Sequence, residues 1–343
     1  MNGGLKPVLA RLAAGEKLSA AESAAAFGVV MDGLATPAQI GGMLMAMRVR
    51  GESVAELTGA VIAMRARMSQ VAAPENAMDV CGTGGDGAAS LNISTAVTFV
   101  LAACGVPVAK HGNRALSSRA GGADVLLALG VNIEPPLMRL PEILAQVGCV
   151  FLFAPRHHPA LRHAAPVRVE LGVRTIFNLT GPMANPAGVK RQLIGVYDPA
   201  WARPVAQTLR DLGCQSAWVV HSQGLDELTL AGPSQVVALQ GGALSEFTLH
   251  PEDAGLAPVP LERIKGGDAK ENAAALLAVL AGAVNGYRQT ILFNVAAALM
   301  VAGKATDLRE GVALAAAAID DGEAARVLER LKIASQERAE TWK

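Results

Sequence analysis

The stretch from Asp79 to Thr95 constrains the fold of this chain most, because a glycine-rich turn joins an apolar strand-like segment to an apolar helical one. Four glycines lie within the six positions Gly82–Gly87, so backbone N–H groups can approach an anion without obstruction by a Cβ atom. Asn92-Ile93-Ser94-Thr95 then begins the helical stretch, whose first N–H groups also favour anions. The pattern predicts a strand–loop–helix unit that binds pyrophosphate.

The same alternation of strand and helix signals continues after about Asn76. We expect strands at Ala77–Cys81, Val106–Ala109, Cys149–Phe153, Gln192–Tyr197 and Ala217–His221, and helices at Thr95–Cys104, Ala123–Leu129, Pro141–Val147 and Ala202–Leu212. Such alternation predicts a mostly parallel central sheet flanked by helices, with ligands bound at the carboxyl ends of the strands. The Ala-rich residues 272–333 are expected to form helices that pack on this sheet.

The first seventy residues instead predict a small all-helical domain. Capping boxes mark three helix starts, at Ser19–Glu22, Thr36–Gln39 and Ser53–Glu56. After Pro37, an apolar stripe at helical spacing is formed by Ile40, Met43, Leu44 and Met47. The stripe fits a small helical core or a subunit interface, and both interpretations stay open. At 343 residues the chain exceeds the usual size of one core, which favours two domains, 1–72 and 73–343.

Charge and cysteine content exclude several classes of protein. Thirty basic and thirty acidic side chains cancel, which argues against a nucleic-acid-binding surface. No run of about twenty apolar residues predicts a membrane span, and the N-terminus does not resemble a signal peptide. The four cysteines lie far apart and are expected to be buried reduced thiols in a cytoplasmic protein.

Two further polar clusters follow predicted strands. The segment Lys110–Arg119 carries three cations and two hydroxyls with flexible glycines beside it, a combination that suits phosphate better than a neutral ligand. Gly224-Leu225-Asp226-Glu227 places adjacent carboxylates after the strand that ends near His221, where they can hold Mg²⁺ together with phosphate oxygens. A solvated basic loop and a solvated acidic turn are the plain alternatives.

In this order the motifs resemble those of the anthranilate phosphoribosyltransferase family. The resemblance runs over nearly the whole chain and rests on Gly82–Asp86, Asn92–Thr95, Lys110–Arg114 and Gly224–Glu227, and also on Phe153–Pro155, His157–Pro159, Ala165–Arg168, Leu171–Asn178 and Gly181-Pro182. It implies a nucleoside phosphorylase-like α/β fold in which part of 155–185 joins the helical domain 1–72. It also implies a homodimer through the N-terminal helices, with no nucleic acid or membrane partner.

The resemblance further implies the reaction and the residues for it. The phosphoribosyl group of 5-phosphoribosyl 1-pyrophosphate passes to the amine of anthranilate, and Lys110, His111, Asp226 and Glu227 match catalytic positions. The positions implied for phosphoribosyl pyrophosphate are Gly82, Thr83, Gly84, Gly85, Asp86, Asn92, Ser94, Thr95, Lys110, Gly112, Asn113, Arg114, Ser117 and Ser118. Those implied for Mg²⁺ are Ser94, Asp226 and Glu227, and those implied for anthranilate are Gly82, His111, Asn113, His158, Arg168 and Pro182.

Two of the residues implied for anthranilate, Arg168 and His111, also have plainer interpretations. Arg168 lies on a helix expected at Ala160–Leu171 beside Arg162 and Glu170, where a surface ion pair would suffice. Without the resemblance, the ion pair is the preferred interpretation of Arg168. As a base, His111 is only a candidate, because an aromatic amine attacks without a proton to lose first.

Two other functions stay open at this point. A pyrimidine nucleoside phosphorylase shares the architecture, but it lacks this form of the Gly82–Gly87 loop and does not need Asp226-Glu227 for a metal. A non-catalytic relative that binds nucleic acid predicts a basic surface, whereas the charge here is balanced. The chain departs from the usual family pattern at Ala120, where serine is common, at Leu127, where an acidic residue is frequent, and at Gln289, where aspartate is common.

Overall fold

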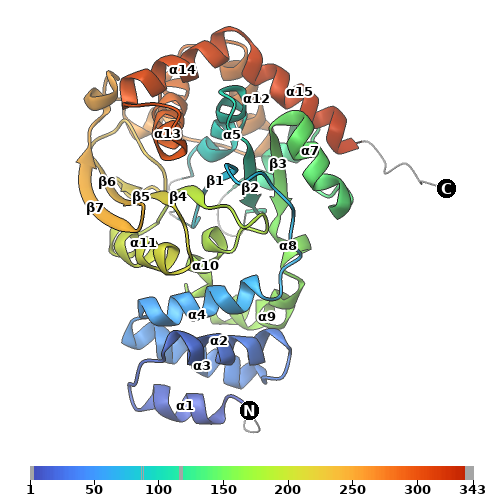
Figure 1. The fold of residues 1–343 in the computed structure, drawn as a ribbon, viewed down its shortest axis with the longest axis vertical. Helices are drawn as coiled ribbons and strands as arrows, with labels where there is room; N and C mark the ends of the chain where they lie inside the picture. Colours follow the sequence, from blue (N-terminus) through green and yellow to red (C-terminus); the bar gives the residue numbers. More distant parts are fainter. Residues whose placement is uncertain (1–3, 86, 88, 116–118, 337–343) are drawn as a thin grey trace, which may run out of the picture.

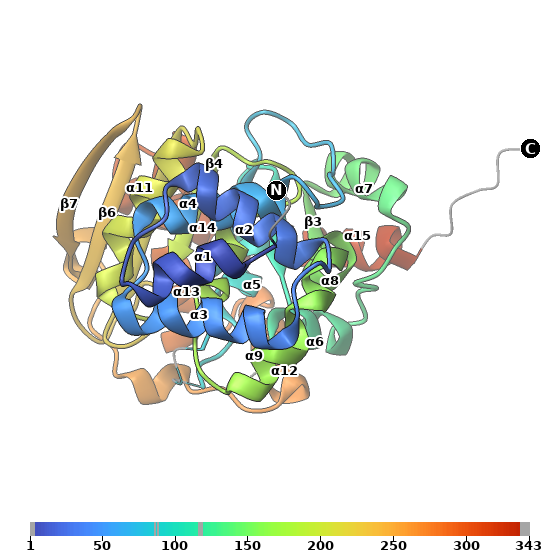
Figure 2. The same ribbon diagram turned by 90° about the horizontal axis from the view of Figure 1, so that it is seen from below.

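Two parts of different construction make up the computed structural model, which describes residues 4–85, 87, 89–115 and 119–336. Figure 1 shows a helical part below and an α/β part above. The helical part contains α1 (Lys6–Ala13), α2 (Ala20–Met31), α3 (Pro37–Arg50) and α4 (Val54–Arg65). In the view from below, α1 and α3 lie nearest to the viewer (Figure 2).

The three predicted capping boxes are confirmed at the starts of α2, α3 and α4. In the third, Glu56 does more than cap its helix: its fully buried carboxylate also accepts from the backbone N–H of Leu18 at 3.0 Å and from Arg50 at 2.6 Å. Because α4 thereby holds the segment before α2 and the last residue of α3, one buried charge fixes how the helices pack.

The apolar stripe of α3 is core. Its four side chains, Ile40, Met43, Leu44 and Met47, are at most 2% exposed within a single chain. They pack with α1, α2 and α4 and with residues far along the sequence. The interpretation of this stripe as a subunit interface is therefore wrong, because the chain already covers it.

Residues from 154 to 183 return to the helical part. They form α8 (Ala154–His157), η2 (Pro159–His163), α9 (Ala165–Leu171) and α10 (Phe177–Met183). Val167 and Phe177 share the core of the first four helices, and the Phe177 ring meets Phe27 edge-on at 5.4 Å. The single helix expected at Ala160–Leu171 is wrong: it breaks at Ala164, because Pro166 disfavours helical continuation just before it. On this packing we propose the division into 1–72 with part of 155–185, and 73–343.

A seven-stranded sheet in the order β3-β2-β1-β4-β5-β6-β7 forms the centre of the upper part. Its strands are β1 (Met78–Gly82), β2 (Val108–Gly112), β3 (Cys149–Phe153), β4 (Arg191–Gly195), β5 (Ser216–Ser222), β6 (Ser234–Gln240) and β7 (Ala243–Leu249). The first five are parallel, as predicted. The antiparallel hairpin β6–β7 was not predicted; it turns at Gly241-Gly242 with both φ angles positive.

Helices cover both faces of the sheet. They are α5 (Ile93–Ala103), α6 (Gly122–Ala128), η1 (Leu137–Arg139), α7 (Leu140–Val147), η3 (Pro199–Trp201), α11 (Ala202–Asp211), η4 (Pro251–Ala254), η5 (Leu261–Ile264), α12 (Ala269–Leu280), α13 (Gly286–Ala302), α14 (Leu308–Asp320) and α15 (Glu323–Gln336). One core joins α5, α13 and α15 to one face, and α11 belongs to the core on the other face. In the described part of the chain, no helix has both the length and the apolar character to cross a bilayer.

The strand order sets the place for a ligand. From β1 the chain moves to β2 and β3 on one side, whereas β4 and β5 continue on the other. The order therefore reverses between β1 and β4, which leaves a crevice at the carboxyl ends of these strands. Gly82 and Gly195 end β1 and β4 and face each other in register.

Candidate active site

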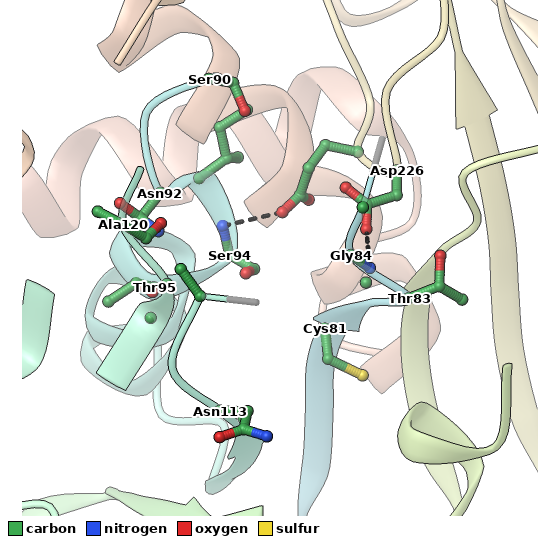
Figure 3. A pocket seen from close by; sticks show the side chains of 18 of the residues that line it. Cys81, Thr83, Gly84, Ser90, Asn92, Ser94, Thr95, Asn113, Ala120 and Asp226 are labelled. Atoms are coloured by element: carbon green, nitrogen blue, oxygen red, sulfur yellow. Dashed lines mark hydrogen bonds between the residues drawn. The ribbon is translucent and has the colours of Figure 1, made fainter. Parts of the chain in front are cut away.

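A cavity of about 290 Å³ opens at this crevice (Figure 3). It lies between the glycine loop after β1, the start of α5, the end of β2 and the loop after β5. Its lining includes most of the predicted residues: Gly82, Thr83, Gly84, Gly85, Asn92, Ser94, Thr95, Lys110, His111, Gly112, Asn113, Arg114, Asp226 and Glu227. Three others, Asp86, Ser117 and Ser118, lie outside the described residues.

The glycine loop is fastened to the neighbouring strand before it enters the cavity. The N–H of Thr83 donates to the carbonyl of Gly195 at 2.9 Å, and the Thr83 hydroxyl accepts from the N–H of Tyr197 at 3.1 Å. Gly84 and Gly85 then adopt φ angles of 69° and 74°, which L side chains disfavour. The turn therefore presents backbone rather than side chains to the cavity.

Asp226 and Glu227 reach two walls of the cavity from the loop after β5. The Asp226 carboxylate accepts from the N–H of Gly84 at 2.6 Å, and the Glu227 carboxylate accepts from the N–H of Ser94 at 3.1 Å. Figure 3 shows both bonds, with Asp226 beside the glycine loop and Ser94 across the cavity from it. The acidic pair therefore joins the glycine loop to the start of α5.

Two glycines make this approach of Asp226 possible. A Cβ atom at Gly195 would lie 2.8 Å from Cα of Asp226 and would overlap its carbonyl group, and one at Gly82 would lie 2.6 Å from the carboxyl carbon. Gly82, predicted as a ligand-binding residue, thus also makes room for a carboxylate. Gly195 was missed, and its only sequence signal is a glycine at the end of an apolar strand.

Lys110 is a buried cation in the floor of the site. Its side chain is 4% exposed, and Nζ donates to the carbonyl of Val80 at 2.7 Å and to the hydroxyl of Ser94 at 3.0 Å. Lys110, His111 and Gly112 belong to β2, so the expectation that they follow the strand in a loop is wrong. Because the hydrogen bonds of the strand hold their backbone, the side chains of Lys110 and His111 are positioned by a rigid element.

The loop after β2 is folded by its own polar groups. Asp124 accepts from the N–H groups of Ala115 and Gly121 at 3.0 and 2.9 Å, and the side chain of Asn113 accepts from the N–H of Arg114 at 2.8 Å. Ala120, where the family commonly has serine, contributes its carbonyl, which accepts from the Asn92 side chain at 3.2 Å. That contact does not depend on the missing hydroxyl.

Two histidines face each other beside the carboxyl end of β2. The rings of His111 and His158 are 5.0 Å apart, and Nδ1 of His111 contacts the carbonyl of Gly181 at 3.1 Å. Burial lowers the pKa of His111 to about 3 and that of His158 to about 4. Within the described residues neither Nε2 atom has a hydrogen-bond partner, so two neutral rings offer buried nitrogen atoms to a ligand.

Arg168 and Pro182 lie on the helices beyond these histidines. The Arg168 guanidinium sits 5.2 Å above the ring of Phe177, and burial lowers the pKa of Arg168. No carboxylate lies within ion-pair distance of it in the part of the chain that the structure describes, contrary to the surface ion pair of the plainer interpretation. Pro182 is buried in α10, and its carbonyl accepts from Gln192 at 2.8 Å.

The acidic pair suits Mg²⁺ rather than a metal enclosed by protein ligands. The described residues contain no group of three or more His, Cys, Asp or Glu side chains able to hold a metal ion. Mg²⁺ is usually bound by one or two carboxylates, with phosphate oxygens and water completing its shell. Asp226, Glu227 and the Ser94 hydroxyl therefore fit Mg²⁺ that arrives with a phosphorylated substrate.

Two further polar groups near the site, Asp79 and Arg174, have no role in the prediction from the sequence. Asp79, fully buried in β1, accepts from the N–H of His111 at 3.1 Å and from the Asn185 side chain at 2.7 Å, and burial raises its pKa to about 6. Arg174 lies 4.0 Å above the Tyr197 ring and close to Gly85. The signal for Asp79 is an aspartate inside an apolar strand. The signal for Arg174 is its place in Leu171–Asn178, one of the segments that carry the resemblance.

Comparisons with known proteins agree with this geometry. The a/b domain of the glycosyl transferase family matches residues 74–325, and its helical bundle domain matches residues 6–68. Anthranilate phosphoribosyltransferase of Afipia carboxidovorans is 58% identical over 332 residues, covering 96% of this chain and 98% of that protein. The Rhizobium meliloti protein of the same name is 56% identical, covering 95% and 97%.

Solved structures are similar to this chain over nearly its whole length. The crystal structure of anthranilate phosphoribosyltransferase from Thermus thermophilus has a TM-score of 0.92 and 42% identity, with 96% of this chain and 99% of that chain covered. The Saccharomyces cerevisiae enzyme, in complex with PRPP and Mg, has a TM-score of 0.89 and 26% identity, with 98% of each chain covered.

Proposed function

The chain belongs to the anthranilate phosphoribosyltransferase family, and from that premise we propose how its residues divide the reaction among them. The enzyme transfers the phosphoribosyl group of 5-phosphoribosyl 1-pyrophosphate to the amine of anthranilate. The products are N-(5-phosphoribosyl)anthranilate and pyrophosphate, in tryptophan biosynthesis. The observation that carries the assignment of residues is the convergence of the glycine loop, Ser94 and the Asp226-Glu227 pair on one cavity.

The phosphates of the donor bind on the β1 side of the cavity. The backbone of Gly82–Gly85 and the first N–H groups of α5 are suited to pyrophosphate, and Lys110 adds a buried positive charge beside them. Asn113 and Arg114, on the loop after β2, line the opposite side. Together with Asp86, Asn92, Thr95, Gly112, Ser117 and Ser118 they complete the proposed donor site.

Mg²⁺ would be held by Asp226, Glu227 and Ser94. When bound, it neutralises charge that develops on the departing pyrophosphate. The chain itself fixes the carboxylates, because each accepts a backbone N–H from the opposite wall. This arrangement keeps their oxygen atoms at the mouth of the anion site before any substrate arrives.

Anthranilate is proposed to bind between β2 and α10. The planar donors of Arg168 match its carboxylate, the buried Pro182 offers an apolar surface to its ring, and Asn113 orients its amine. His111 and His158 contribute the unpartnered nitrogen atoms described above. A neutral His111 is able to accept the amine proton, which makes it the candidate base.

Catalysis then consists mainly of positioning and charge stabilisation. The C1–O bond to pyrophosphate breaks through an oxocarbenium-like transition state, and the anthranilate nitrogen forms the new C1–N bond. Lys110 and the amides of the glycine loop stabilise the leaving group, while the acceptor pocket holds the amine at C1.

The assembly and compartment of the enzyme are further proposals. We expect a homodimer through the N-terminal helical part, using exposed apolar side chains such as Leu34, Val49 and Val169 because the α3 stripe is buried. Light scattering of the purified protein measures the mass. Four free cysteines favour the cytoplasm as the compartment.

The activity is tested by following anthranilate fluorescence in the presence of phosphoribosyl pyrophosphate, with and without Mg²⁺. We expect consumption of anthranilate that requires the metal. Phosphate-dependent cleavage of thymidine or uridine, with anthranilate untouched, would move the assignment to a nucleoside phosphorylase.

A further inference from the structure

Helix α13 touches both walls of the active-site cavity through buried hydrogen bonds, although none of the described lining residues belongs to it. On one side, the Tyr287 hydroxyl donates to the carbonyl of Asn92, the residue immediately before α5, at 3.0 Å. On the other, the Asn294 side chain accepts from the N–H of Leu228 at 3.0 Å and donates to its carbonyl at 2.8 Å. Leu228 directly follows Asp226 and Glu227 in sequence.

We propose that α13 sets the distance between the phosphate-binding start of α5 and the acidic pair, with Tyr287 and Asn294 as positioning residues. The inference rests on the proposed function, because it concerns the binding of phosphoribosyl pyrophosphate with Mg²⁺. Neither residue lines the cavity. Each binds the backbone of a residue that either belongs to the site or lies within two positions of a site residue.

The helix has the geometry that such a spacer needs. Tyr287 and Asn294 are seven residues apart, so they lie on nearly the same face, about 10.5 Å apart along the axis at 1.5 Å per residue. Both are almost fully buried, at 2% and 0% exposure. Because a helix does not stretch, moving one contact relative to the other requires the whole helix to shift.

The surroundings of α13 resist such a shift. Arg288 forms two bonds with Asp320 of α14, at 2.7 and 2.8 Å, and Asn285 caps the first turn by accepting from the N–H of Arg288 at 2.9 Å. Phe293 and its apolar neighbours on α13 belong to the same core as the buried side chains of α5. The helix is therefore held in register with the element whose start it supports.

The two contacts differ in how replaceable they are. The Asn92 carbonyl also accepts from the N–H of Ala96 at 3.2 Å, so loss of the Tyr287 hydroxyl leaves it one partner. Leu228 has both of its backbone groups on Asn294. We therefore expect a graded effect from Tyr287→Phe and a larger one from Asn294→Ala.

The first test compares Tyr287→Phe with Thr290→Val in the full-length protein. Thr290 offers a matched control, because its buried hydroxyl donates to the Gly286 carbonyl within the same helix and reaches no part of the cavity. Isothermal titration calorimetry measures the Kd for phosphoribosyl pyrophosphate at fixed Mg²⁺. We expect the Kd to rise at least threefold in Tyr287→Phe and to stay within 1.5-fold of wild type in Thr290→Val, at similar losses of Tm.

The second test concerns the acidic pair. In Asn294→Ala the Mg²⁺ concentration needed for half-maximal donor binding should rise at least fivefold, while Phe293→Leu, equally buried on the same helix, should lower Tm without that change. In Tyr287→Phe and in Asn294→Ala, the KM for anthranilate at saturating donor should stay within twofold of the wild-type value. If Asn294→Ala does not fold, Tyr287→Phe decides alone.

Equal rises in Kd for Tyr287→Phe and Thr290→Val, or no rise in either, would overturn the inference. A wild-type protein that binds the donor but leaves anthranilate unchanged would contradict the proposed function and not the inference, since binding is the measured quantity. Wild-type protein that fails to bind the donor would contradict both.

Discussion

The close approach of Asp226 to β4 predicts that Gly195→Ala abolishes efficient catalysis. The new Cβ atom would lie 2.8 Å from Cα of Asp226, whereas ordinary contacts begin near 3.4 Å, and it would overlap the carbonyl group. Cα must therefore retreat by more than half an ångström and the carbonyl by more. The strand cannot yield easily, because Gly195 is paired to β1 and accepts from Thr83.

The size of the effect follows from the tolerance of the site. A displacement of about 1 Å costs roughly 100-fold in rate when positioning dominates, and Mg²⁺ requires oxygen atoms at about 2.0–2.1 Å. We expect kcat/KM to fall at least 100-fold, which is about 2.7 kcal/mol of transition-state stabilisation. Overpacking should also lower the stability by about 1–3 kcal/mol.

Anthranilate fluorescence at several Mg²⁺ concentrations measures the loss, and thermal unfolding measures the stability. Gly42→Ala is the control, because its Cβ would meet only a Leu9 methyl group, at 3.6 Å. Gly82→Ala should lower the stability less than Gly195→Ala, since a carboxylate is able to rotate away where a backbone carbonyl is not. A Gly195→Ala enzyme within threefold of wild-type kcat/KM would refute the reasoning.

Three other predictions concern the rest of the site. Asp226→Asn should lower kcat/KM about 100-fold and raise the Mg²⁺ concentration needed for half-maximal rate at least tenfold. Measuring the rate over a range of Mg²⁺ concentrations tests this, and an unchanged requirement would show that Asp226 does not bind the metal. Arg168→Ala should raise the KM for anthranilate at least tenfold and that for the donor less than twofold in steady-state kinetics, and the reverse split would place Arg168 elsewhere. Burial lowers the pKa values of His111 and His158 to about 3 and 4, so below about pH 6.5 both rings take up protons when the protein unfolds. The free energy of unfolding should therefore fall by about 2 kcal/mol per ring as the pH drops from 7 to 5. Urea unfolding of wild type and of His111→Asn at both pH values checks this: the variant should lose less, and an equal loss would contradict a neutral buried His111.

Local sequence signals predicted much of the fold because they act over short distances. The capping boxes at Ser19, Thr36 and Ser53 involve residues three apart, and all three form as expected. The strand Cys149–Phe153 is predicted with its observed bounds, because it is apolar throughout and is followed by the proline-containing start of α8. Lys110 and His111 were placed after β2 rather than in it, since polar side chains at a strand end look like loop.

The residues that the sequence did not reveal act over long separations. Asn294 contacts Leu228 across 66 positions and Tyr287 contacts Asn92 across 195, and no periodicity links such pairs. Gly195 matters only because the loop after β5 passes over the end of β4. Predicting these requires the register of the sheet and the path of the loops, which follow from tertiary packing rather than from any single segment.

The charges that line the cavity predict that the donor and Mg²⁺ bind together. Among the described lining residues, Lys110 and Arg114 supply two cations and Asp226 and Glu227 supply two carboxylates, so these side chains sum to no net charge. Pyrophosphate carries several negative charges, and the acidic pair alone would repel it. In the proposed site Mg²⁺ would neutralise that wall, so donor affinity should depend steeply on the metal. The proposed acceptor pocket has Arg168 and two neutral histidines, and it would need no metal to receive a single carboxylate.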